Sequence, residues 1–107
     1  MSITIHIFYT GKNGSAKMFM DEMISNGIVD DIRNEKGNLR YDYFMPINDK
    51  ETILLIDSWE NQEALDIHHS LPLMKRIMKL REKYDLHMKV EKYVEISDDK
   101  DKSFIRE

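Results

Sequence analysis

The sequence predicts an α+β domain in which helices cover one face of a four-stranded antiparallel sheet. Three observations predict this class. Segments of alternating apolar and polar residues are interleaved with segments of helical apolar spacing, in the order β-α-β-β-α-β. The one direct strand-to-strand connection is short, which favours antiparallel pairing. The length of 107 residues suits a single domain. This element order is that of the ferredoxin-like split βαβ arrangement.

The first strand and the first helix are expected at the start of the chain. Residues 3–9 alternate, with three isoleucines and Tyr9 on one face. A break with two glycines follows, and Ser15 is a candidate helix N-cap. Apolar residues then recur at positions 16, 19, 20, 23, 24 and 28, which is helical spacing. Gly27 is expected to end or kink this helix, and residues 28–32 to add a further turn.

The middle of the chain predicts a hairpin. Residues 39–44 alternate, with Leu39, Tyr41 and Tyr43 on one face. Residues 46–51 form the short connection, and the third strand is expected over 52–59.

A second helical region and a last strand complete the pattern. Asn61 is a candidate N-cap, and residues 64, 65 and 68 share the face expected to be buried. Pro72 suits the first turn of another helix, whose apolar side carries residues 73, 77, 80 and 84 with Met74 and Met78 beside them. Residues 88–96 alternate as a strand. The domain is therefore expected over 1–96, with 97–107 as a charged tail.

The third strand is apolar on both faces, and this predicts a partner. Ile53 and Leu55 point to one side, Leu54 and Ile56 to the other. Helices cover only one face of such a sheet, so a second copy of the sheet is expected on the other. We therefore predict a homodimer that closes a β-barrel between subunits.

Composition excludes several functions. The net charge of −4 and pI near 5.6 provide no basic stripe for nucleic acid. The chain has no cysteine, and neighbouring His68 and His69 diverge too far on a helix to chelate one ion, so no metal site is expected. The N-terminus alternates like a strand instead of a signal peptide, and no apolar stretch reaches membrane-spanning length. A cytoplasmic location is the expectation.

Two segments resemble a known family. Residues 37–41 (GNLRY) and 57–68 (DSWENQEALDIH), together with the element order, resemble the antibiotic biosynthesis monooxygenase family over residues 2–96. The resemblance implies a dimeric α+β barrel with a pocket between sheet and helices. It also implies several activities: cofactor-independent oxidation of quinols and aromatic polyketides, haem degradation, and isomerisation of a phosphorylated signalling sugar. Fold alone does not choose among them.

The haem-degrading branch typically carries an asparagine in the first strand, then a tryptophan and a histidine ten residues apart after the third strand. The first strand here has no asparagine, and His68 and Met78 stand at the other two positions. The resemblance therefore implies no haem chemistry, and no cofactor is expected.

His68 and Asp57 are the candidate catalytic residues. An imidazole on the inner face of a short helix can act as base, acid or hydrogen-bond donor near neutral pH. Asp57 could orient it, and burial would raise the pKa of such an acid. The alternatives are a core histidine bonded to a backbone carbonyl or to Asp57, and a strand-end acid bonded to a nearby group.

Four further residues are candidate substrate contacts. Trp59 could stack on a planar ring, Tyr41 and Tyr43 could hydrogen-bond its oxygens, and Met78 could form part of an adaptable pocket wall. Plain core or interface packing is the alternative for each.

The leading hypothesis is a cofactor-independent monooxygenase of a quinol-like or phenolic substrate. His68 would favour the phenolate, an electron-rich anion that can pass an electron directly to O₂. A second hypothesis is isomerisation of a hydroxy-carbonyl compound, for which Arg40, Arg76 and Arg81 are the available phosphate ligands. A third is a non-catalytic dimeric module that binds a small aromatic molecule.

Overall fold

A computed structural model describes residues 1–96 and 100–106 of the chain. Its strands are β1 (Ile3–Thr10), β2 (Asn38–Phe44), β3 (Thr52–Trp59) and β4 (His87–Val94). Its helices are α1 (Ser15–Ser25), α2 (Ile28–Arg33), α3 (Gln62–Ser70) and α4 (Leu73–Lys83), followed by a short 3₁₀ turn η1 (Lys102–Phe104).

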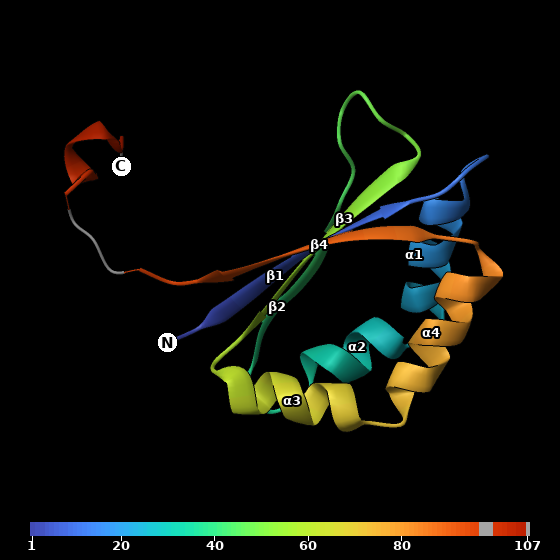
Figure 1. The fold of residues 1–107 in the computed structure, drawn as a ribbon, viewed down its shortest axis with the longest axis horizontal. Coiled ribbons are helices and arrows are strands. Elements are labelled where there is room, and N and C mark those ends of the chain that lie inside the picture. Colours follow the sequence, from blue (N-terminus) through green and yellow to red (C-terminus); the bar gives the residue numbers. More distant parts are fainter. Residues whose placement is uncertain (97–99, 107) are drawn as a thin grey trace.

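The four strands form one antiparallel sheet in the order β2-β3-β1-β4. All four α-helices lie on one side of it, as Figure 1 shows. The predicted fold class is confirmed, with one refinement. Each α unit of the β-α-β-β-α-β pattern is a pair of helices, α1–α2 and α3–α4.

The core lies between the sheet and this helical layer. The odd-numbered residues of β1 are buried, as the alternation predicted. They pack with the inward residues of β3 and with apolar helix residues, the largest of which are Phe19, Met23, Ile32, Leu65 and Ile77. Burial of these side chains is the main stabilising contribution to the fold.

The helix ends correct one expectation and confirm two. Ser15 is the first helical residue and not the N-cap, a position that Gly14 fills with φ 81°. The Ser15 hydroxyl instead accepts a hydrogen bond from the backbone N–H of Lys12. Gly27 does end the first helix, because its left-handed φ of 75° separates α1 from α2. Asn61 caps α3 as expected, accepting from the backbone N–H of Ala64.

The sheet face away from the helices is uncovered in the single chain and rich in apolar side chains. Phe8, Leu54 and Ile56 are only half-buried there, and Phe44 and Tyr93 are exposed. We call this surface the uncovered face.

The last strand ends earlier than expected. β4 ends at Val94, and Ile96 is exposed. Residues 97–99 and 107 of the expected tail lie outside the described residues, whereas 100–106 lie away from the body of the domain with Phe104 and Ile105 exposed (Figure 1).

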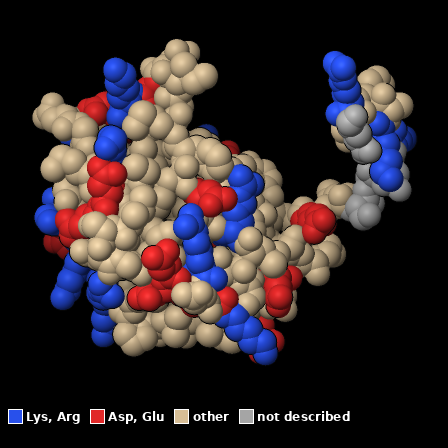
Figure 2. Space-filling model, turned by 180° about the vertical axis from the view of Figure 1, so that it is seen from behind, with Lys and Arg blue, Asp and Glu red and all other residues tan. Residues whose placement is uncertain are grey.

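Charges of both signs alternate over the surface. Figure 2 shows acidic and basic side chains interspersed on the face it presents, with no continuous basic region there. In the described part of the chain, no helix has the length and apolar character to cross a membrane.

Candidate functional site

A cavity of about 200 Å³ lies between the sheet and helices α3 and α4. We call it the inner cavity. Its wall is mostly apolar, from β1, β3, β4 and α4, and its polar side chains are Tyr41, Asp57, His68, His69 and Arg81. The sequence placed these residues on four separate elements, and the fold brings them to one space.

His68 reaches this cavity from the buried side of α3. Its Nδ1 lies 3.0 and 2.9 Å from the two carboxylate oxygens of Glu35, in the turn after α2. Because a carboxylate only accepts, Nδ1 is the nitrogen that carries the proton. Within the described residues Nε2 has no hydrogen-bond partner, and it is not a fully buried atom. Its lone pair therefore faces the inner cavity, which His68 lines.

Of the two alternatives for Asp57, orienting His68 or bonding a nearby group, the structure shows a bond to a nearby group. Its carboxylate accepts the indole N–H of Trp59, two residues along β3. Burial raises the pKa of Asp57 to about 6, while the Trp59 hydrogen bond and the charge of His68 act in the opposite direction. Asp57 therefore acts on His68 only through its charge.

Trp59 is fully buried, so it is a structural support and not a platform open to substrate. Its indole lies against the imidazole of His68 with ring centroids 4.6 Å apart. The predicted stacking contact with substrate is therefore replaced by a stacking contact with His68.

Of the two tyrosines predicted to contact substrate, only one lines the inner cavity. Tyr41 lines the inner cavity, and burial raises its pKa well above the usual value. Tyr43 does not line that cavity, and its hydroxyl is buried without a hydrogen-bond partner in the described residues. Tyr9, which the sequence placed only in the core, accepts two hydrogen bonds from Arg81 at 3.2 and 2.9 Å.

Met78 does not line the cavity and is 59% exposed on α4. Met74, one turn earlier, lines the inner cavity instead. The helical spacing marked both methionines as flanking the apolar side, and only packing against the sheet separates them.

The three arginines do not converge. Arg81 lines the inner cavity. Arg40 lies toward the uncovered face, where it pairs with Asp42 and stacks over Phe44. Arg76 is exposed and is not among the residues that line the cavity. No three His, Asp or Glu side chains within residues 1–96 and 100–106 are grouped as metal ligands.

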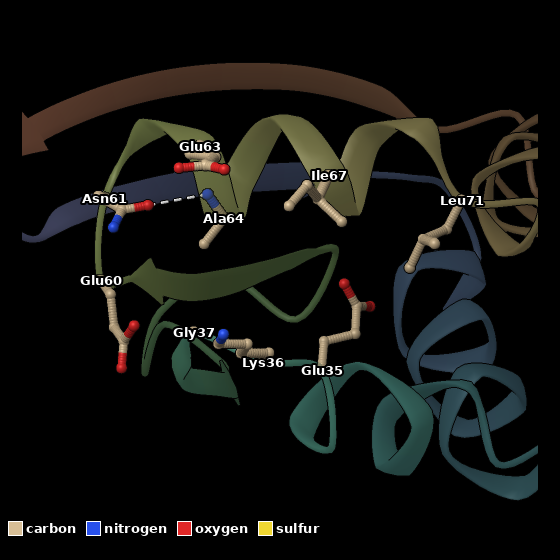
Figure 3. Close-up of a pocket in the computed structure, with 9 residues that line it drawn as sticks. All are labelled: Glu35, Lys36, Gly37, Glu60, Asn61, Glu63, Ala64, Ile67 and Leu71. Carbon is tan, nitrogen blue, oxygen red and sulfur yellow. Dashed lines mark hydrogen bonds between the residues drawn. The ribbon is translucent and has the colours of Figure 1, made fainter.

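A second cavity, of about 410 Å³, lies on the other side of α3, and we call it the outer cavity. Figure 3 shows the turn of Glu35, Lys36 and Gly37 facing Ala64, Ile67 and Leu71 from α3 and the segment after it. Glu35 is the residue that connects the two spaces, since it lines the outer cavity and bonds His68 of the inner one. Sequence reasoning missed Glu35, because a turn residue 33 positions away gives no local signal of this contact.

The family model described as "Antibiotic biosynthesis monooxygenase" matches residues 2–80. The chain belongs to this family. No curated protein sequence matches the chain.

Solved structures agree with the fold. A candidate antibiotic biosynthesis monooxygenase from Deinococcus radiodurans is 19% identical, with a TM-score of 0.78 over 92% of this chain and 95% of that one. A Pseudomonas aeruginosa protein, PA3566, is 23% identical, with a TM-score of 0.76 over 90% of this chain and 95% of its own. SnoaB from Streptomyces nogalater, described as a cofactor-independent oxygenase, is 10% identical, with a TM-score of 0.74 over 91% and 95%. At these identities the likeness establishes the fold alone.

Proposed function

We propose that this family member is a cofactor-independent monooxygenase that oxidises a small quinol or phenol with O₂ in the inner cavity. The observation that carries the proposal is the orientation of His68. A buried imidazole holds its Nδ1 proton on Glu35 and presents Nε2 to an apolar cavity. That arrangement suits a general base for a phenolic hydroxyl.

The proposed chemistry needs only the substrate and O₂. His68 Nε2 accepts the phenolic proton, and the resulting phenolate transfers one electron to O₂. For a quinol with a free ring C–H, the overall reaction with one O₂ replaces that hydrogen by a hydroxyl group, oxidises the quinol to the quinone and releases the second oxygen atom as water. The apolar walls exclude competing water from this step.

Tyr41 and Arg81 are the proposed contacts for the substrate oxygens. Tyr41 and Arg81 both line the inner cavity, where the Arg81 guanidinium also donates to the Tyr9 hydroxyl. Asp57, with its pKa near 6, is proposed to tune the charge of the site. This retains His68, Asp57 and Tyr41 from the sequence hypothesis, adds Arg81, and assigns Trp59, Tyr43 and Met78 no substrate contact.

The volume of the inner cavity limits the size of the substrate. About 200 Å³ is below the 300–1,000 Å³ of pockets that hold drug-sized ligands. A one-ring or two-ring quinol is therefore proposed, in place of the polycyclic substrates that the family resemblance also allows.

A homodimer is part of the proposal. The uncovered face carries Phe8, Leu54 and Ile56, which a second copy of the same sheet would bury across a two-fold axis. Polar residues on this face are already paired, as in the 2.8 Å hydrogen bond between Thr4 and Ser58. An apolar surface with its polar groups satisfied is suited to association.

The test is O₂ uptake with menadiol-type substrates. We expect wild-type turnover, a loss of at least about a hundredfold in kcat for His68→Gln, and no change for Met78→Ala, which is exposed on the same helical layer. Equal O₂ uptake by wild type and His68→Gln would overturn the role of His68. Tight binding of the aromatic compound without turnover would identify the chain as a binding module instead.

The isomerase alternative receives less support. A phosphorylated substrate would need several cations at the cavity, and of the three candidate arginines only Arg81 lies there.

A further inference from the structure

Glu35, the hydrogen-bond partner of His68, is largely buried. Its side chain is 12% exposed, and that of His68 is 4% exposed. Both carboxylate oxygens lie within hydrogen-bond distance of His68 Nδ1. Among the described residues, His68 is the only ionic partner of this carboxylate. Because a buried charge without a partner is strongly destabilising, the Glu35 carboxylate depends on its hydrogen bond with His68.

The turn that carries Glu35 is fixed against α3. Its backbone N–H donates to Ile32 and its carbonyl accepts from Asn38. The carbonyl of Gly37 accepts from the backbone N–H of Glu60, which leads into α3. A Cβ on Gly37 would lie 2.6 Å from the Cβ of Ala64, so the turn sits closer to α3 than any other residue type allows. This close approach holds the Glu35 carboxylate under His68.

The pair also separates two spaces. His68 lines the inner cavity, Glu35 lines the outer cavity, and α3 lies between them. In Figure 3 the Glu35 carboxylate rises from the turn toward α3, with the rest of the outer cavity beside it. Nε2 faces the inner cavity, and Nδ1 faces Glu35. The two ring nitrogens therefore connect the inner cavity with the outer cavity through one hydrogen bond.

We propose that Glu35 is a positioning residue that fixes the Nδ1–H tautomer of His68 and stabilises the imidazolium while Nε2 holds the substrate's proton. This inference rests on the proposed function for the source of the proton. Nε2 accepts the proton of the phenolic hydroxyl, and the ring becomes an imidazolium whose charge is balanced by the Glu35 carboxylate. Nε2 then gives this proton to the reduced oxygen atom that leaves as water. The Nδ1 proton stays between the ring and Glu35, so His68 returns to its starting tautomer.

The tautomer is measured without substrate. In ¹⁵N-labelled wild-type protein at a pH where the ring is neutral, we expect the His68 shifts of an Nδ1–H tautomer and a slowly exchanging Nδ1 proton. In Glu35→Ala we expect a mixture of tautomers and fast exchange. Glu63→Ala is the matched control, because Glu63 lines the same outer cavity but is exposed and makes no bond to His68. A wild-type tautomer in Glu35→Ala would overturn the proposal.

The contribution of the Glu35 charge to catalysis is measured by chemical rescue. We expect Glu35→Ala to lower kcat by about tenfold to a hundredfold, and formate to restore at least half of the loss with saturation. Formate is small enough to reach the vacated carboxylate position through the outer cavity. Glu35→Gln keeps the shape of the side chain without its charge, so we expect the same loss and no rescue. It also keeps the test decisive if Glu35→Ala does not fold.

The outcomes separate this inference from the proposed function. If wild type turns over and Glu35→Ala matches it, the catalytic role of Glu35 is wrong and the monooxygenase proposal stands. A slow Glu35→Ala that formate does not rescue would mean that Glu35 only holds the turn against α3, and would overturn its role in stabilising the imidazolium. If wild type consumes no O₂ with any substrate, the proposed function fails, and the ¹⁵N shifts still decide whether Glu35 sets the tautomer.

Discussion

The indole of Trp59 lies 4.6 Å, centroid to centroid, from the imidazole of His68, with the ring planes inclined by 30°. Trp59 also donates its N–H to Asp57. One fully buried side chain thus contacts both of the residues that the sequence marked as candidate acid and base. The pair of candidates is held by the tryptophan between them and not by a bond to each other.

The Trp59 fluorescence should report its contact with His68. Trp59 is the sole tryptophan of the chain, and its indole lies against the imidazole of His68. We expect the emission of His68→Gln to differ from that of wild type at the same pH, and the emission of Met78→Ala, exposed on α4, to match wild type. Equal emission from wild type and His68→Gln would contradict the contact.

The raised pKa of Asp57 predicts a specific pH dependence of stability. Folding moves this pKa from 3.8 to about 6, so between these values the native state holds a proton that the unfolded state has lost. The stability contributed by protonated Asp57 is therefore full below about pH 4 and is lost as the pH rises through 6. Asp57→Asn keeps an oxygen for the Trp59 N–H and carries no charge.

We accordingly expect Asp57→Asn to raise the free energy of unfolding at pH 8 by up to about 3 kcal/mol and to change it little at pH 3.5. Urea unfolding followed by circular dichroism at both pH values checks this. Equal effects at the two pH values would contradict the assignment to Asp57 ionisation.

The Tyr43 hydroxyl should be dispensable for stability. It is buried without a partner in the described part of the chain, and an unsatisfied buried hydroxyl costs about 1–3 kcal/mol. We expect Tyr43→Phe to be at least as stable as wild type. Tyr9→Phe is the comparison, because it removes the acceptor of two Arg81 hydrogen bonds and should destabilise by about 1–3 kcal/mol. Thermal unfolding of both variants checks this. A clear loss of stability in Tyr43→Phe would mean that the Tyr43 hydroxyl is hydrogen-bonded in solution.

Gly37 should tolerate no side chain. Its φ is +88°, and an added Cβ would lie 2.6 Å from the Cβ of Ala64. Gly27 has a similar φ of +75° with nothing near its Cβ position, so Gly27→Ala measures the backbone cost alone, about 1–3 kcal/mol. We expect Gly37→Ala to cost more than Gly27→Ala in urea unfolding. Equal costs would show that the turn can move away from α3 freely.

The uncovered face should control association. Ile56→Glu places a charge among its half-buried apolar residues, and we expect this variant to sediment as a monomer at micromolar concentration where wild type is a dimer. Ile24→Glu, on the exposed side of α1, is the control and should leave association unchanged. A monomeric wild type would remove the homodimer from the proposal.

The sequence by itself determined the elements and the fold class. Alternation in residues 3–9 and 52–59, helical spacing around 16–28 and 64–80, and the N-cap at Asn61 each reflect local geometry, which repeats along the chain and can be read from it. The burial of His68 also followed from its position within the helical period, whereas the face that Asp57 and Trp59 occupy did not follow from the apolar third strand.

Only the tertiary structure decided which residues meet. The Glu35–His68 contact, the choice of Met74 over Met78 and of Arg81 over Arg40, and the enclosure of Trp59 depend on how α3 and α4 lie against the sheet. Periodicity specifies the face on which a side chain lies, but a contact between residues 33 positions apart depends on the packing of whole elements.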